Sequence, residues 1–481
     1  MTPLSSGAPI SGLPVLHAFR STRVVTPDGV RPATVVVQYD RILSIRPWDH
    51  CPTGVAIHDF GSHVILPGLV DTHVHINDPG RDWEGFPTAT QAAASGGVTT
   101  LVDMPLNCIP ETISAAALET KRSTAANNSF VDWMAWGGIV GNPASPGNTS
   151  EIPSLTAAGV PGFKCFLIHS GIEGFAWTDE PQLRKALAAL SNSNLPLLVH
   201  AELADPIDRA TSNLQTADWR RYKTYLASRP DAAELEAIHL LIRLAAEYNV
   251  HIHIVHLATA QALDAIRKAR ASGIRITVET CPQYLHFSSD EIPDSATQFK
   301  CAPPIRSAAN REALWQALRE GLIDFVATDH SPCPPALKQL EPGRPEAARF
   351  DTAWGGIASL GLALPILWTG LTTRFDSDDS QFIQLARWLS TEPARLASLT
   401  GRKGAIAPGH DADFAVFDPG QLWTVTESDL HFRHKISPYL GAQLHGRVLE
   451  TWLRGRRIFY RQEDAPHILP IPHGQELSSD L

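Results

Sequence analysis

The sequence predicts an α/β fold, a TIM-like (β/α)8 barrel with a smaller β-sandwich domain built from both termini. Three observations support this prediction. Eight short apolar or β-branched segments alternate with helical segments between residues 64 and 328. Polar residues stand where several of these segments end, which is where barrel enzymes keep their chemistry. Further segments typical of strands precede and follow this region, and they lack helices between them.

The alternating segments account for a complete barrel. The predicted strands span residues 64–76, 99–104, 131–139, 160–168, 195–201, 251–257, 274–280 and 324–328. Segments between them, such as residues 234–249 and 260–271, carry apolar residues three and four positions apart, as helices that cover a sheet do. Strands separated by helices run parallel, and eight such units are enough to close a barrel.

The two ends of the chain predict a second, smaller unit. Residues 15–63 contain short strands, and residues 34–45 suggest a hairpin that turns at residues 39–41. Strands also recur beyond residue 404. Neither set is large enough to be stable alone, so we expect both to form one domain. The expected division is residues 1–64 and 403–481, the latter with a tail, for this domain and 65–402 for the barrel.

Composition narrows the class of partner. The chain has 481 residues and a formal net charge of −10, which argues against nucleic acid and anionic membrane surfaces and favours a small molecule. Its 6 cysteines are scattered without a Cys-x-x-Cys pair, so we expect neither a disulfide framework nor a zinc knot. No apolar run approaches the ~20 residues of a membrane span, and the N-terminus has no leader pattern. A cytoplasmic protein is expected.

The first predicted strand ends in a pair of histidines. Side chains alternate along a strand, so His73 and His75 point the same way and can bind one metal ion from one side. Chance is the alternative, because the chain contains 20 histidines. The turn-forming residues 77–80 end the strand where the pair projects, which favours a metal site.

Other predicted strands also end in residues able to serve such a site, namely Lys164, His200, His256 and Asp329. Each alone has an ordinary structural explanation, but their coincidence predicts a shared site. Imidazole and carboxylate groups suit zinc or a similar divalent ion. An ammonium group does not, since it has no lone pair. Burial would lower the pKa of Lys164 and permit its carboxylation to a carbamate able to bridge two metals.

These residues stand in motifs that resemble the amidohydrolase superfamily, in its cyclic-amidase branch. The motifs are Asp71-Thr-His-Val-His75, Gly162-Phe-Lys-Cys-Phe166, Val199-His-Ala-Glu202, Ile254-Val-His-Leu257 and Ala327-Thr-Asp-His-Ser331. The resemblance covers nearly the whole chain, including residues 404–414. Within the branch, residues 77–86, 102–107, 300–306 and 329–333 are most similar to the allantoinases.

The resemblance implies two divalent metal ions joined by hydroxide and by carboxylated Lys164. His73, His75 and Asp329 would hold one ion, and His200 and His256 the other. Asp329 would take a proton from the hydroxide and pass it to the leaving nitrogen. The implied reaction opens the cyclic amide of allantoin to give allantoate, and a homodimer or homotetramer is implied as the assembly.

Two substrate contacts are also expected. Asn77 stands where dihydroorotases similarly carry an arginine for the substrate carboxylate, and a neutral amide suits allantoin, which has no carboxylate. Turn chemistry explains Asn77 equally well. The segment around Cys301 supplies the second contact. One departure is Gln283, where relatives often carry a histidine, so any role of that histidine is open here.

Three alternatives remain from the sequence. A hydantoinase or dihydropyrimidinase would use the same metals on another ring, and a dihydroorotase is disfavoured by Asn77. A non-catalytic scaffold, from a different class, would be expected to have lost metal ligands, and all six are present. The ligand set does not identify the metal, because availability often decides occupancy.

Overall fold

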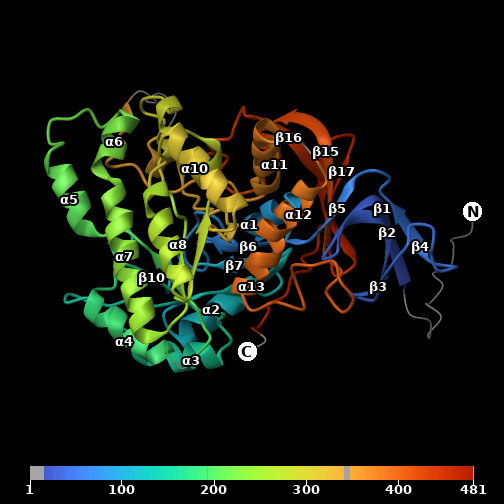
Figure 1. Cartoon of the computed structure of the whole chain (residues 1–481), viewed down its shortest axis with the longest axis horizontal. Helices are drawn as coiled ribbons and strands as arrows, with labels where there is room; N and C mark the ends of the chain where they lie inside the picture. The colour runs from blue at the N-terminus through green and yellow to red at the C-terminus, as the bar shows by residue number, and fades with distance from the viewer. Residues whose placement is uncertain (1–15, 192, 341–346, 377, 480–481) are drawn as a thin grey trace, which may run out of the picture.

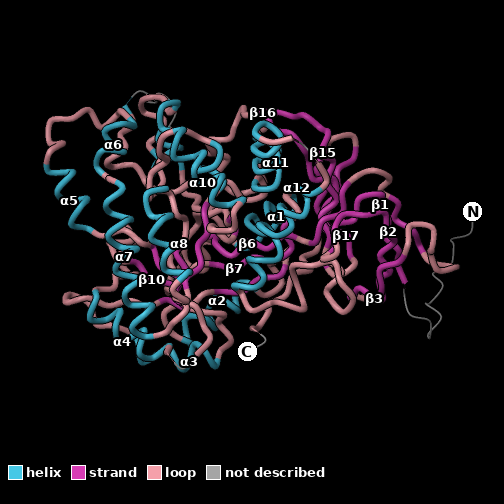
Figure 2. Tube along the Cα trace, viewed as in Figure 1, coloured by secondary structure: helices cyan, strands magenta, loops and turns pink. Residues whose placement is uncertain are grey.

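The structure is a computed structural model that describes residues 16–191, 193–340, 347–376 and 378–479. Helices surround a central group of strands, and the first and last strands of the chain lie together at one side (Figure 1). Figure 2 shows the same division by secondary structure, with the helices around the barrel and a second group of strands beside it. Among these residues no helix is long and apolar enough to cross a membrane.

The barrel strands follow the predicted order. They are β6 (Leu69–Val74), β7 (Val98–Asp103), β8 (Asp132–Ala135), β10 (Phe163–Phe166), β11 (Leu197–His200), β12 (Ile252–Ile254), β13 (Ile276–Thr280) and β14 (Phe325–Val326). Paired neighbours are parallel. After β8 the chain continues into β9 (Gly137–Gly138), which pairs with β10. The ring closes where the backbone N–H of His75 donates to the carbonyl of His330 at 2.8 Å. The predicted barrel is therefore confirmed.

Helices cover the barrel. The longer ones are α1 (Phe86–Ser95), α2 (Ala115–Ala125), α4 (Glu180–Leu190), α5 (Ala204–Ser212), α7 (Asp231–Tyr248), α8 (Leu263–Ala271), α10 (Ala308–Arg319) and α11 (Ala363–Arg374). The shorter ones are α3 (Ile152–Ala157), α6 (Tyr222–Ser228), α9 (Pro282–His286), α12 (Ser380–Ala386) and α13 (Glu392–Leu396). In α4 the Asp179 side chain caps the first turn by accepting from the backbone of Gln182. Leu183, Leu187 and Leu190 then form its buried face.

The two termini form one sheet of nine strands. Its members are β1 (Leu16–Thr26), β2 (Gly29–Gln38), β3 (Arg41–Arg46), β4 (Ala56–Asp59), β5 (Val64–Pro67), β15 (Phe414–Thr424), β16 (Gln443–Leu453), β17 (Arg456–Gln462) and β18 (Ala465–Ile468). The N- and C-terminal parts join where β5 pairs antiparallel with β15. The predicted hairpin is confirmed by β2 and β3, which turn at Tyr39. The sheet curves over its own apolar face, since the Phe19 ring lies 4.8 Å from that of Trp452 across two intervening strands.

The structure divides residues 64–76, which we expected to form one strand, into β5 and β6. β5 belongs to the terminal sheet, so residues 65–67 lie with that sheet although we expected the barrel to begin at residue 65. Gly68 joins the two strands at a crowded point. A Cβ atom there would lie 2.4 Å from Oγ1 of Thr99 and 2.7 Å from Cβ of Asp413. Both strands are buried, so their apolar patterns run together in the sequence.

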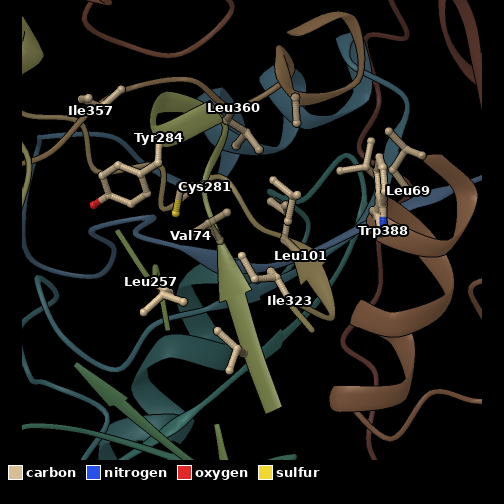
Figure 3. Close-up of a cluster of buried hydrophobic side chains, with 14 of the residues drawn as sticks. Leu69, Val74, Leu101, Leu257, Cys281, Tyr284, Ile323, Ile357, Leu360 and Trp388 are labelled. Atoms are coloured by element: carbon tan, nitrogen blue, oxygen red, sulfur yellow. The ribbon is translucent and has the colours of Figure 1, made fainter. Parts of the chain in front are cut away.

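One apolar core joins the barrel strands to the surrounding helices. Figure 3 shows Val74, Leu101, Leu257 and Ile323 from different parts of the barrel packed in this core. Trp388, in the segment between α12 and α13, lies beside Leu69 in the same view. This packing fixes the strand ends that carry the functional side chains.

A buried ion cluster joins the barrel to the terminal sheet. The Nζ atom of Lys403 lies 2.7 Å from Asp132 of β8, 2.8 Å from Asp411 and 2.6 Å from Asp413. Arg454 forms a second ion pair with Asp132. The three carboxylates come close enough together to hold a metal ion, but the ammonium group of Lys403 already lies among them. This cluster is a structural joint between the two units.

Candidate active site

The C-terminal ends of the barrel strands bring the predicted histidines and aspartate together. Nε2 of His73 and Nε2 of His75 lie 3.2 Å and 3.3 Å from Oδ1 of Asp329. Nδ1 of His200 lies 3.0 Å from Nε2 of His256. One ligand atom from each of His73, His256 and Asp329 falls within 4.8 Å of the others, which is close enough for a shared metal ion. All five side chains are buried.

Lys164 is fully buried in β10 and has an unusual environment. Its Nζ atom forms no hydrogen bond with any described residue. The same atom lies 3.7 Å from the centre of the Phe166 ring, which in turn stacks on His200. Burial lowers the pKa of Lys164 to about 8, although Cys165 and Asp329 act in the opposite direction. A buried amine without a partner is unfavourable, so this position is suited to a modified or metal-contacting lysine.

Carboxylates behind the histidines orient the rings. Nδ1 of His73 donates to Oε1 of Glu279 at 2.5 Å, and Nε2 of His200 donates to Oε2 of Glu202 at 2.8 Å. The other nitrogen of each ring is thereby directed into the site. Burial alone would raise the pKa of Glu279, but His73 and a hydrogen bond from His253 lower it to about 2. Glu279 is therefore ionised near neutral pH.

Two of the candidate metal ligands adopt an unusual backbone conformation. His256 has φ of 39° and Asp329 has φ of 47°, both in the left-handed region that most side chains avoid. Each residue follows the end of its strand, β12 or β14. Strain of this kind persists where the surrounding structure holds it, and such positions concentrate at functional sites.

A cavity of about 780 Å³ opens above this cluster. His73, His75, His200, His256 and Asp329 contribute to its wall, together with residues from the segments that follow the barrel strands, including Asn107, His169, Lys300 and Trp354 from loops and Tyr225 from α6. A cavity of this size suits a small molecule.

The two predicted substrate contacts lie behind the cavity wall. Asn77 is fully buried, its Nδ2 donates to the carbonyl of His75 at 3.0 Å, and its Oδ1 has no partner among the described residues. Its φ of 62° fits the turn explanation as well. Cys301 is also buried, and its carbonyl accepts from the Tyr225 hydroxyl at 2.6 Å. Its neighbours Lys300 and Ala302 line the cavity. Both contacts stay predictions.

Gln283, which stands where relatives often carry a histidine, lies in the protein interior. Its side chain is fully buried, and neither its Oε1 nor its Nε2 atom has a hydrogen-bond partner among the described residues.

Glu279 and Glu202 were not predicted as site residues. Glu202 stands in the same motif as His200, which is the signal that could have identified it.

Comparisons with known proteins identify the family of the chain. A model of the Amidohydrolase family matches residues 64–458. An allantoinase from Streptomyces avermitilis is 47% identical over 441 residues, covering 91% of this chain and 94% of the relative. Allantoinases from Arabidopsis thaliana and Saccharomyces cerevisiae are 43% and 40% identical, over 91% and 96% of this chain and 87% and 98% of their own lengths.

Solved structures give the same fold. The L-hydantoinase (dihydropyrimidinase) from Arthrobacter aurescens superimposes with a TM-score of 0.87 at 27% identity, covering 96% of this chain and all of that one. A dihydropyrimidinase from Brevibacillus agri gives a TM-score of 0.83, also at 27% identity, over 96% of this chain and 99% of that one. The chain belongs to the amidohydrolase family and, within it, to the group formed by the allantoinases.

Proposed function

We propose that the protein is an allantoinase, which hydrolyses the cyclic amide of allantoin to give allantoate. One observation carries the proposal: four buried histidines and Asp329 line a cavity of small-molecule size, and Lys164 is buried in the neighbouring strand β10. Identities of 40–47% to allantoinases over most of the chain support allantoin as the cyclic amide that is hydrolysed.

The residues at the site fit two divalent metal ions. His73, His75 and Asp329 would hold one ion, His200 and His256 the other, and carboxylated Lys164 both. The buried Nζ atom of Lys164 without a partner supports this assignment, as does the chemistry of imidazole and carboxylate ligands, which suits zinc. When bound, such ions lower the pKa of water and polarise a carbonyl group.

In the proposed reaction Asp329 transfers the proton. Burial opposes ionisation, but His73, His75 and His256 hold the pKa of Asp329 well below its usual range. As a carboxylate it accepts a proton from the attacking water while the water oxygen bonds to the ring carbonyl carbon. The carbon–nitrogen bond of the ring then breaks, and Asp329 returns the proton to the leaving nitrogen. The products are a carboxylate and an open ureido group.

A hydantoinase or dihydropyrimidinase is the second candidate, because solved structures with those names share the fold. Their identity of 27% is well below the 47% of the Streptomyces avermitilis allantoinase.

We also propose a cytoplasmic location for the protein and a homodimer or homotetramer as its assembly. One allantoinase relative, from Aquarana catesbeiana, is named as mitochondrial.

The test is to compare turnover of allantoin, hydantoin, dihydrouracil and dihydroorotate by the purified full-length protein. We expect the highest kcat/KM for allantoin, with allantoate as the product. A higher kcat/KM for dihydrouracil would make the protein a dihydropyrimidinase. Absence of turnover for all four rings by protein that contains metal would overturn the proposed activity and favour a scaffold.

A further inference from the structure

Polar groups on β12 and β13 continue behind the candidate metal centre, with Glu279 and His253 fully buried and Thr277 and His251 half-buried. Oε2 of Glu279 accepts from Nε2 of His253 at 3.1 Å. Nδ1 of His253 lies 2.8 Å from the hydroxyl of Thr277, which also lies 2.7 Å from Nε2 of His251. His73 donates to the other oxygen of Glu279, so His73, Glu279, His253, Thr277 and His251 form a chain of hydrogen-bonded groups. We call this chain the polar column; it leads from the site toward the opposite end of the barrel.

The column leaves Glu279 little freedom. Its two carboxylate oxygens bind different partners, Oε1 with His73 and Oε2 with His253. Rotation of the carboxylate would break one of these bonds inside a core where neither Glu279 nor His253 has any solvent exposure. An unpaired polar group at such depth is costly, so the arrangement is strongly preferred.

His253 is itself held on several sides. Both of its ring nitrogens are hydrogen-bonded, and its ring stacks on Phe325 of β14 with centroids 5.2 Å apart and planes 8° apart. Core packing alone would need a ring of this shape, whereas it would not need the bond to Glu279. The two explanations therefore differ in what a substitution of His253 should do.

We propose that His253 is a positioning residue that acts through Glu279 to hold His73 with its Nε2 facing the metal centre. This inference rests on the proposed ligand set. Removing the bond from His253 would free one oxygen of Glu279 and loosen the ring of His73. Loss of a supporting residue of this kind typically weakens metal affinity about 10- to 100-fold.

Two substitutions distinguish the hydrogen bond at Nε2 of His253 from the one at Nδ1. In His253→Gln the side-chain amide can take the place of Nε2 and keep a donor for Glu279. In His253→Asn the shorter amide takes the place of Nδ1, so it keeps Thr277 and loses Glu279. Zinc affinity is measured by competition with a chelator of known affinity, using the full-length protein. We expect His253→Asn to bind zinc about 10- to 100-fold more weakly and His253→Gln to stay within about 3-fold of the unaltered chain.

Equal zinc affinity in both variants, whether unchanged or equally reduced, would overturn the proposal. If either variant fails to fold, Thr277→Val removes the hydrogen bond at Nδ1 of His253, which is one of its supports, and should weaken zinc binding by a few fold. Unchanged zinc affinity in that variant would also overturn the proposal. The assay contains no allantoin, so it is independent of which ring the enzyme opens. If the unaltered chain binds no zinc, the proposed ligand set itself is wrong.

Discussion

The Nζ atom of Lys164 lies 3.7 Å from the centre of the Phe166 ring and has no hydrogen-bond partner among the described residues. Burial lowers its pKa to about 8, so a sizeable fraction of the amine is neutral near physiological pH. The neutral amine is the form that reacts with carbon dioxide. The environment of Lys164 therefore supports its carboxylation.

We predict that Lys164→Ala lowers allantoin turnover more than about 100-fold, beyond the usual effect of losing a supporting residue. Short carboxylic acids such as acetate or propionate should restore part of the activity, because they replace the missing oxygens. The measurement is turnover with and without added acid. Lys185→Ala, on the exposed surface of α4, is the control and should be fully active. Full activity of Lys164→Ala without added acid would exclude the carbamate.

Asp329→Asn keeps the size of the side chain but removes its ability to accept a proton. We predict that kcat falls about 10²- to 10⁴-fold, as expected for loss of a general base. Metal content should be measured on the same sample, so that loss of an ion is distinguished from loss of proton transfer. An unchanged kcat in a variant that keeps its metal would remove Asp329 from the proton path.

Much of the fold could be predicted because the barrel strands are short apolar runs separated by amphipathic helices. The division of residues 64–76 could not, since β5 and β6 are both buried and Gly68 between them breaks no apolar pattern. The candidate metal ligands could be predicted because they stand at the ends of the predicted strands. Glu279 could not, because its contact with His73 joins residues that are 206 positions apart.

The substrate contacts of Asn77 and Cys301 stay predictions, because motif position alone does not tell whether a side chain reaches the substrate. Both side chains are buried, and residues close to them in the sequence line the cavity. The walls themselves come from loops after several strands, including Lys300 and Trp354. Loops of this kind carry no periodic signal, so their convergence on the site appears only in three dimensions.

Lys403→Met should destabilise the protein by about 3–5 kcal/mol, because it leaves Asp132, Asp411 and Asp413 buried without their shared cation. The measurement is the midpoint of urea unfolding. Lys268→Met is the control, since its pair with Asp264 is exposed and should contribute less than about 1 kcal/mol. Equal midpoints for the two variants would contradict the role of the cluster as a joint.

His286 predicts a pH dependence of stability. Burial, followed by the charges of Arg311 and Arg374, lowers its pKa from 6.5 to about 4. Between these values the unfolded chain binds a proton that the folded chain does not, so stability falls as the pH drops from 6.5 toward 4. At pH 5 this loss is about 2 kcal/mol.

The variant that tests this pH dependence is His286→Phe, because a phenyl ring can keep the ring contacts with Phe287 and Tyr439 but cannot bind a proton. Its urea midpoints at pH 7 and pH 5 should lie closer together than those of the unaltered chain. His50→Phe, at an exposed position, should leave the difference unchanged. If His286→Phe also leaves it unchanged, the histidine is not the group that titrates.

The most direct test of the central claim is allantoin turnover by the purified protein after chelation and stepwise return of zinc. The proposed site predicts that metal-free protein is inactive and that activity recovers as up to two ions bind per chain, with allantoate as the product. Undiminished turnover by protein verified to be free of metal would contradict the account.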